Sequence, residues 1–318
     1  MSVADEPAVS PAPLDAILQK VLEAVPFQLT TEGGPDAARQ RFRDLPRRAV
    51  HPELRVEDRT IDGPAGPLPI RLYWPPETDI APPVVMFFHG GGWAVGDLDS
   101  YDGEARNHAV GAGALVVSID YRLAPEHPYP AAVDDVWAAT QWVAAHGEEL
   151  GADPKRLAVA GDSAGGNLAA VIAHVARDSG GPPVAFQLLW YPATTWDTSL
   201  PSFTENADAP ILAIDAVAEL SRWYARGTDL RNPPSTLVPA RAEDLTGLPP
   251  AYIAVAGRDP LRDDGLRYAE LLAAAGVPVE VHNATGLVHG YIGYAGIVPA
   301  ATDAVDRGLA ALRAALHG

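Results

Sequence analysis

The ten residues 158–167, Ala-Val-Ala-Gly-Asp-Ser-Ala-Gly-Gly-Asn, constrain the fold of this chain more than any other stretch. A short apolar run enters Gly161, Ser163 follows, and an Ala-rich run leaves. This pattern predicts a buried strand, a sharp turn at Ser163 and a helix. Gly161 and Gly165 flank the turn because backbones that approach this closely leave no room for a side chain. The turn would lift the Ser163 hydroxyl clear of the sheet, at a helix N-terminus that favours developing negative charge.

Apolar runs alternate with helical stretches along the chain, which predicts a mostly parallel sheet covered by helices on both faces. The predicted strands are 54–61, 68–73, 84–88, 114–119, 157–160, 186–190, 252–256 and 277–281. The predicted sheet-flanking helices are 101–112, 131–146, 164–177, 261–275 and 300–316. The first two strands alternate apolar and polar residues, so we expect them to form a hairpin at a sheet edge.

Two segments do not fit this alternation, and they predict a helical cap. Helical spacing over 14–24 and 36–44 precedes every strand, and a long excursion between Trp190 and Ala251, with a helix near 215–226, interrupts the later part. We therefore expect N-terminal cap helices in 1–48 and a catalytic domain in 49–318, with a cap insert at about 193–246. The first thirteen residues have the composition of a disordered lead-in.

The charge balance narrows the range of partners. The chain carries 41 acidic and 23 basic residues, a net charge of −18, so we expect no binding to nucleic acid or to an anionic membrane. It has no cysteine, which excludes disulfides, thiolate nucleophiles and cysteine-ligated metals. Residues 1–13 lack the pattern of a secretory signal and no apolar stretch has the length of a membrane span. We expect a soluble, cytoplasmic protein.

The strand at 84–88 runs into His89-Gly90-Gly91-Gly92-Trp93. Consecutive glycines let backbone N–H groups turn toward one point, which is what the oxyanion of acyl transfer requires. We expect the donors to be Gly90, Gly91 and Ala164, with Gly92 as the alternative to either glycine. We expect His89 to pin this loop by a hydrogen bond. A phosphate-binding loop is disfavoured because the G-x-G-x-x-G spacing and a following lysine are missing from the sequence.

A serine nucleophile needs a base and a carboxylate that orients the base. His289 lies in a short loop after the last predicted strand, from which it can reach back over the sheet. Asp259 stands immediately past the strand at 252–256, whereas Asp263 and Asp264 fall in the first turn of the next helix, where acids complement the helix dipole. The order Ser163, Asp259, His289 is the order found in α/β-hydrolases.

Five motifs together resemble the hormone-sensitive-lipase family of serine esterases. They lie at 89–93, 120–126, 161–167, 259–261 and 289–291. The resemblance covers about 84–291 and implies an α/β-hydrolase fold with a helical cap. It implies hydrolysis of carboxylic esters with short to medium acyl chains through an acyl-enzyme, without metal or cofactor. It also implies the site roles: Ser163 as nucleophile, Asp259 as acid, His289 as base, and Gly90, Gly91 and Ala164 as oxyanion donors.

The substrate pocket and the partners are less constrained. We expect the pocket walls to be Trp93, Phe203, Leu212 and Tyr291, the last at a position where the family more often has phenylalanine. We expect 120–126 to form an ion-pair and turn network that holds the glycine loop and the turn at Ser163. Two other functions stay open, an amidase or formamidase and a catalytically inactive small-molecule receptor. The expected partner is a small-molecule ester, and a homodimer paired through the edge strand and final helix is an open expectation.

Overall fold

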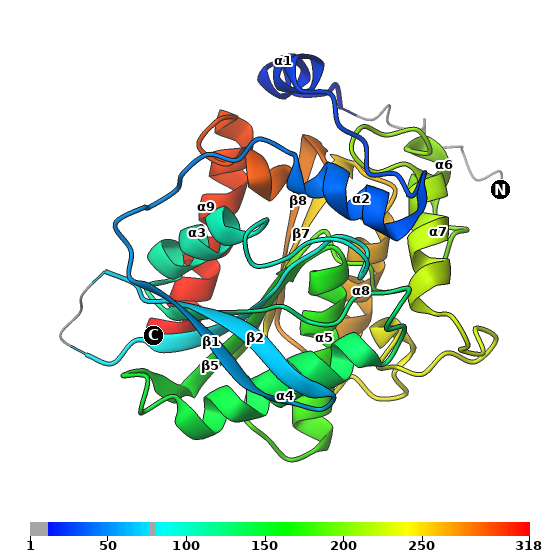
Figure 1. Cartoon of the computed structure of the whole chain (residues 1–318). Helices are drawn as coiled ribbons and strands as arrows, with labels where there is room; N and C mark the ends of the chain where they lie inside the picture. Colours follow the sequence, from blue (N-terminus) through cyan, green and yellow to red (C-terminus); the bar gives the residue numbers. More distant parts are fainter. Residues whose placement is uncertain (1–11, 77–79) are drawn as a thin grey trace, which may run out of the picture.

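A computed structural model describes residues 12–76 and 80–318, and its centre is an eight-stranded sheet (Figure 1). The strands are β1 (Val56–Gly63), β2 (Gly66–Tyr73), β3 (Pro83–Phe88), β4 (Leu115–Ile119), β5 (Asp153–Asp162), β6 (Phe186–Trp190), β7 (Ala251–Arg258) and β8 (Val279–Val288). Their order is β1-β2-β4-β3-β5-β6-β7-β8. The pairs β1/β2 and β2/β4 are antiparallel and all later pairs are parallel. The mostly parallel sheet with an edge hairpin is confirmed.

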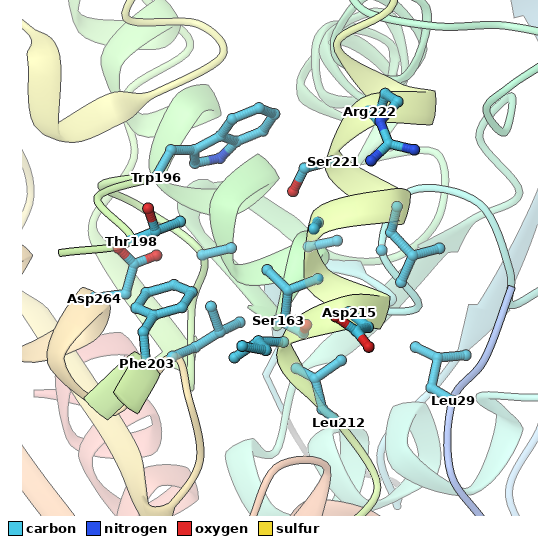
Figure 2. Close-up of a pocket in the computed structure, with 18 of the residues that line it drawn as sticks. Leu29, Ser163, Trp196, Thr198, Phe203, Leu212, Asp215, Ser221, Arg222 and Asp264 are labelled. Carbon is cyan, nitrogen blue, oxygen red and sulfur yellow. The ribbon is translucent and has the colours of Figure 1, made fainter. Parts of the chain in front are cut away.

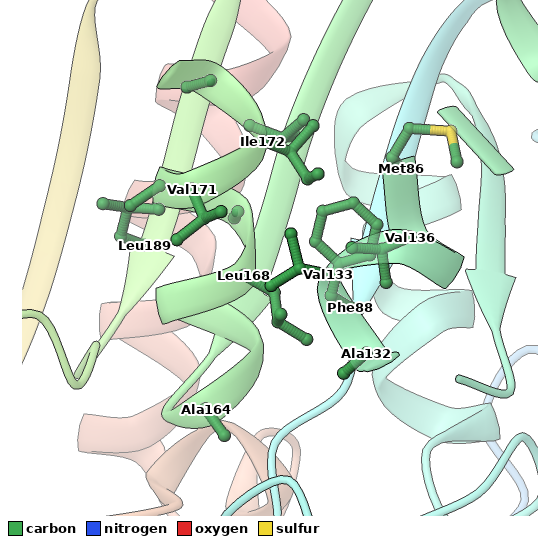
Figure 3. Packing of buried hydrophobic residues seen from close by; sticks show 14 of the residues in the cluster. Met86, Phe88, Ala132, Val133, Val136, Ala164, Leu168, Val171, Ile172 and Leu189 are labelled. Atoms are coloured by element: carbon green, nitrogen blue, oxygen red, sulfur yellow. The ribbon is translucent and has the colours of Figure 1, made fainter. Parts of the chain in front are cut away.

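Helices cover both faces of this sheet. One face carries α3 (Asp102–Ala112) and α9 (Pro299–His317), and the other carries α4 (Ala131–His146), α5 (Ala164–Asp178) and α8 (Arg262–Ala274). Alternate residues of β3 serve the two faces: Val85 and Phe87 pack with α3 and α9, and Met86 and Phe88 pack with α4 and α5. Figure 3 shows the side chains of α4 and α5 meeting over Met86 and Phe88.

Three strands run further toward the site than the sequence predicts. β5 continues to Asp162, directly before Ser163, β7 continues to Arg258, directly before Asp259, and β8 continues to Val288, directly before His289. The prediction ended the last strand at residue 281 because polar residues follow. β8 is an edge strand, so its alternate side chains face solvent and its sequence has no continuous apolar run.

The remaining helices lie before the first strand and between β6 and β7. They are α1 (Ala16–Ala24) and α2 (Gly34–Arg43), then α6 (Pro201–Glu205), α7 (Ile214–Tyr224) and η1 (Pro239–Arg241), with η2 (Tyr291–Tyr294) after β8. Gln28 forms a parallel bridge with Ile211, and the Leu29 N–H donates to the Ile211 carbonyl at 2.7 Å. The N-terminal segment and the insert are therefore joined through their backbones. None of the helices in the described ranges combines the length and apolar character needed to span a bilayer.

Helix α5 begins so close to the sheet that its second residue must be glycine. A Cβ on Gly165 would lie 1.9 Å from the carbonyl oxygen of Phe88. A Cβ on Gly161 would lie 2.3 Å from the carbonyl oxygen of Gly165. Because these neighbours are backbone atoms of a buried strand and helix, they cannot move aside as a flexible side chain can.

We predict that Gly165→Ala lowers the free energy of unfolding by about 3 kcal/mol or more, because the new methyl group collides with the backbone of β3. Gly103→Ala is the control, since a Cβ there meets only Val50 Cγ2 at 3.5 Å and the position is helical. The control should be neutral or more stable by about 0.5–1 kcal/mol. Urea denaturation of both variants measures the difference, and equal midpoints would contradict the close contact.

Candidate active site

Ser163 occupies a strained turn between β5 and α5. Its backbone angles are φ 55° and ψ −116°, and residues other than glycine rarely adopt a positive φ. Its N–H donates to the carbonyl of Trp190 in β6 at 2.8 Å, so the neighbouring strand holds the turn. Backbone strain of this kind persists only where the surroundings enforce it, and it is concentrated at functional sites.

Three predicted residues form a hydrogen-bonded chain at the carboxyl end of the sheet. Ser163 Oγ lies 2.9 Å from Nε2 of His289, and Nδ1 of His289 lies 2.7 Å from Oδ2 of Asp259. Asp259 is fully buried, and its other oxygen accepts the N–H of Leu261 at 2.8 Å. A carboxylate beside Nδ1 favours the tautomer with the proton on Nδ1, which leaves Nε2 free to accept the serine proton.

The glycine loop after β3 differs from the prediction at its first glycine. The N–H of Gly90 donates to Oδ1 of Asp162 at 2.8 Å, so it cannot also meet a substrate oxygen, and the prediction of Gly90 as a donor is wrong. Gly91 and Gly92 follow with φ of 96° and 59°. Within the described ranges, the N–H groups of Gly91, Gly92 and Ala164 make no hydrogen bond. These three donors remain available beside Ser163.

Asp162 is a buried carboxylate that the sequence analysis did not single out. Its side chain receives the Gly90 N–H and lies 3.4 Å from the hydroxyl of Tyr101, and among the described residues it forms no ion pair. Burial, with the nearby Glu104 carboxylate acting in the same direction, raises the pKa of Asp162 to about 7. The group is therefore protonated on the acid side of neutrality while it still offers an oxygen to the loop.

The network predicted at 120–126 is present and reaches the N-terminal helices. The hydroxyl of Tyr121 donates to the His89 carbonyl at 2.7 Å, and Nδ1 of His89 bonds to the next carbonyl at 2.8 Å. Burial lowers the pKa of His89 to about 4, so this histidine is neutral and pins the loop, as predicted. Arg39 of α2 donates to the Ala124 carbonyl at 3.0 Å and pairs with Glu126 at 2.6 Å.

A cavity of about 590 Å³ opens above Ser163 (Figure 2). Trp196, Thr198 and Phe203 of the insert lie on one side of it, and α7 faces them from the other side. Of the first 48 residues, within the part that the structure describes, Leu29 is the one that lines the cavity. Helices α1 and α2 therefore do not line the cavity.

Three of the four predicted wall residues line this cavity, namely Trp93, Phe203 and Leu212. Tyr291 does not, and that prediction is wrong. Its side chain is fully buried, and its ring centre lies 5.2 Å from that of Tyr191, which in turn packs 4.7 Å from the His289 ring. The chain turns into η2 after His289, and this turn directs Tyr291 behind the hydrogen-bonded chain.

Asp264 makes contacts that the sequence does not predict. It is 1% exposed and accepts the N–H groups of Thr194 at 2.8 Å and Thr195 at 2.9 Å, together with the Thr195 hydroxyl. Burial raises its pKa to about 6. Asp264 lies in the first turn of α8, as predicted, and in addition it anchors the first residues of the insert to this helix. Nothing in the sequence distinguishes it from Asp263, its neighbour in the same helical turn.

Asn167 makes a similar anchor from α5. Its Nδ2 donates to the carbonyls of Ala193 at 2.8 Å and Leu237 at 3.1 Å, near the two ends of the insert. The residue belongs to a motif that the sequence analysis identified, but only the folded chain shows which carbonyls it reaches.

We predict that Asp162→Asn removes part of the pH dependence of stability. The folded chain holds a proton on Asp162 up to about pH 7, whereas the unfolded chain releases it near pH 4. Stability therefore falls as pH rises through this window, by up to about 1.4 kcal/mol per pH unit for one group. Asparagine keeps the acceptor for Gly90 and cannot ionise. Denaturation at pH 4.5 to 7.5 should show a shallower fall than in the parent.

The control for this measurement is Asp229→Asn. Asp229 is exposed and its pKa is lowered by the side chain of Arg231, so it titrates below the window. The control should keep the slope of the parent. The same slope in Asp162→Asn would contradict the assignment of that proton to Asp162.

Comparison with known proteins places this geometry in a family. Residues 85–293 match the family model described as the alpha/beta hydrolase fold. The chain is 68% identical over 307 residues to Esterase LipI of Mycobacterium tuberculosis, covering 96% of each protein. It is 56% identical to Carboxylesterase NlhH of the same species, covering 98% of this chain and 99% of that protein. The crystal structure of DphMB1 superposes with a TM-score of 0.93 at 73% identity, covering 96% and 99% of the two chains.

These relatives agree with the fold and with a hydrolase of esters. The eight-stranded, mostly parallel sheet carries Ser163, Asp259 and His289 at its carboxyl edge in the order typical of the fold. Proteins at 56–68% identity over nearly the whole chain bear the names esterase and carboxylesterase. The chain therefore belongs to the α/β-hydrolase family, as a serine carboxylesterase of the hormone-sensitive-lipase group.

Proposed function

We propose that the chain hydrolyses esters with short to medium acyl chains through an acyl-enzyme on Ser163. The observation that carries the proposal is the hydrogen-bonded chain from Ser163 through His289 to Asp259, which opens into an apolar cavity of about 590 Å³. A cavity of this size fits a small ester with both its acyl and alcohol parts.

In the first step Ser163 Oγ bonds to the ester carbonyl carbon while Nε2 of His289 takes the hydroxyl proton. Asp259 keeps its charge, holds the ring in place and stabilises the imidazolium that forms. His289 then gives the proton to the leaving alkoxide oxygen as the C–O bond breaks. Water then attacks the acyl carbon while His289 takes a proton from it. His289 returns this proton to Ser163 Oγ as the bond between the acyl group and the serine breaks and the carboxylic acid leaves.

The negative oxygen of each tetrahedral intermediate needs preset donors. We assign these to the N–H groups of Gly91, Gly92 and Ala164, in place of Gly90, because the Gly90 donor is engaged by Asp162. The N-terminus of α5 adds its partial positive charge at the same place. Each such donor contributes on the order of 3 kcal/mol to the transition state.

The relatives named esterase and carboxylesterase support an ester over an amide substrate, and no feature of the site favours an amidase. A cytoplasmic location and a homodimer stay predictions. Cell fractionation tests the location, and light scattering of the purified chain tests the dimer.

We predict that Ser163→Ala lowers kcat for p-nitrophenyl butanoate by several orders of magnitude, because the acyl acceptor is lost. Ser179→Ala is the control, since Ser179 is exposed at the opposite end of α5 and should leave kcat unchanged. The parent should cleave the matched p-nitroanilide far more slowly than the ester. More than about a tenth of the parent's activity in Ser163→Ala would exclude this residue as nucleophile.

We predict that Gly91→Ala lowers kcat by about a hundredfold with a smaller change in KM, because the oxyanion is fully developed only in the transition state. A Cβ on Gly91 would lie 2.3 Å from the Val95 carbonyl oxygen, so the loop must leave its conformation. Gly276→Ala is the control, with a similar positive φ of 81° and open space around it. A folded Gly91→Ala enzyme with the kcat of this control would place the donors elsewhere.

A further inference from the structure

A second set of hydrogen bonds ties the loop that carries Asp259 to the cap insert. The Ser202 hydroxyl in α6 donates to the carbonyl of Pro260 at 2.6 Å. Asn206, directly after α6, donates through Nδ2 to the carbonyl of Asp259 at 3.1 Å. Ser202 is fully buried and Asn206 is 4% exposed, so water does not compete for these carbonyls.

The connection continues into the first turn of α8. The Ser202 N–H donates to Oδ2 of Asp263 at 2.8 Å, and the Asp263 N–H donates back to Ser202 Oγ at 3.2 Å. This reciprocal pair has the logic of a capping box, but its two halves come from separate segments. Arg262 adds an ion pair with Glu205 at 2.8 Å. The insert segment 202–206 therefore fixes the whole stretch 259–263.

The orientation of Asp259 depends on this stretch. Its Oδ2 faces Nδ1 of His289, in the loop after β8, and its Oδ1 accepts the N–H of Leu261, in its own loop, so each oxygen has one partner. The carbonyls that Ser202 and Asn206 hold belong to the two peptide units between Asp259 and Leu261. The Pro260 carbonyl and the Leu261 N–H belong to the same peptide unit, so rotation of this unit would remove the donor that holds Oδ1 of the carboxylate.

We infer that Ser202 and Asn206 are positioning residues for Asp259: they hold the backbone at 259–260 so that the carboxylate meets Nδ1 of His289. This inference rests on the proposed role of Asp259 in orienting the base. Phe203, which follows Ser202 in α6, lies on the cavity wall (Figure 2). The five-residue helix α6 therefore both lines the cavity and holds the loop that carries Asp259.

The test compares two serine-to-alanine variants in the insert, one at Ser202 and one at Ser199. Ser202→Ala should lower kcat about tenfold while KM stays within about twofold, because ground-state binding does not need the acid. It should also move the acid limb of the kcat/KM pH profile to lower pH, since a displaced carboxylate stabilises the imidazolium less. Ser199→Ala is the control: Ser199 is exposed and its hydroxyl bonds to Asp197 within the segment at 2.6 Å. It should change neither quantity.

Two further variants make the outcome decisive. Asn206→Ala should reproduce the pH shift through a separate hydrogen bond, and it carries the test if Ser202→Ala does not fold. In an Asp259→Asn background, Ser202→Ala should lower kcat by less than about twofold, because a residue that acts through Asp259 has nothing left to position. Thermal unfolding of each variant separates this effect from lost stability.

The inference and the proposed function fail in different ways. An Asp259→Asn enzyme with nearly the parent's kcat would overturn the proposed acid, and the inference with it. An inactive Asp259→Asn enzyme, with Ser202→Ala and Asn206→Ala matching Ser199→Ala in kcat and pH profile, would overturn the inference alone.

Discussion

The close approach of α5 to the ends of β3 and β5 is the constraint on which this site depends. Gly165 lies against the Phe88 carbonyl with no room for a side chain, and Ser163 keeps a φ of 55° because the strands on both sides fix its neighbours. The same approach brings the first N–H groups of α5 beside the glycine loop, so that Gly92, Ser163 and Ala164 border one cavity. Any outward movement of α5 would separate Ser163 both from the Trp190 carbonyl in β6, to which its N–H donates, and from the N–H groups of the glycine loop.

Three buried aspartates near this contact differ in task because they differ in partner. Asp259 faces an imidazole, Asp162 faces a backbone N–H of the glycine loop, and Asp264 faces two backbone N–H groups at the start of the insert. Burial raises the pKa of Asp162 to about 7 and that of Asp264 to about 6. In both residues the hydrogen bonds from the backbone act against burial, because they favour the charged carboxylate.

The sequence predicted features that local chemistry determines. The glycines around Ser163 and the apolar run before them are sufficient to define the turn, and the strand ends place Asp259 and His289 at one edge of the sheet. The direction of a single N–H is not a local property. Gly90 turns away from the substrate because Asp162, 72 residues later, lies beneath it.

The insert was the least predictable part for the same reason. Helix α6 has five residues, too few to show a helical period, and it is held by Ser202 and Asp263 rather than by its own apolar face. Asp264 sits where acids commonly complement a helix dipole, and only the approach of Thr194 and Thr195 gives it another task. Outside the insert, Tyr291 was also misplaced by the prediction, because the chain turns into η2 after His289 and the Tyr291 ring packs against Tyr191.

The N-terminal segment and the insert are hydrogen-bonded to three of the four segments that form the site: the glycine loop, α5 and the loop of Asp259. Arg39 of α2 donates to the Ala94 carbonyl at 2.9 Å, which fixes the glycine loop from the N-terminal side. Asn167 of α5 donates to the Ala193 carbonyl in the insert, and Asn206 of the insert donates to the carbonyl of Asp259. A rigid-body movement of these two segments would break the bonds to the glycine loop, to α5 and to the loop of Asp259 together. The hydrogen bonds therefore make both segments part of the frame that holds Ser163, Asp259 and the glycine loop in register, and residues that shape the cavity are neighbours in sequence of those that hold the frame.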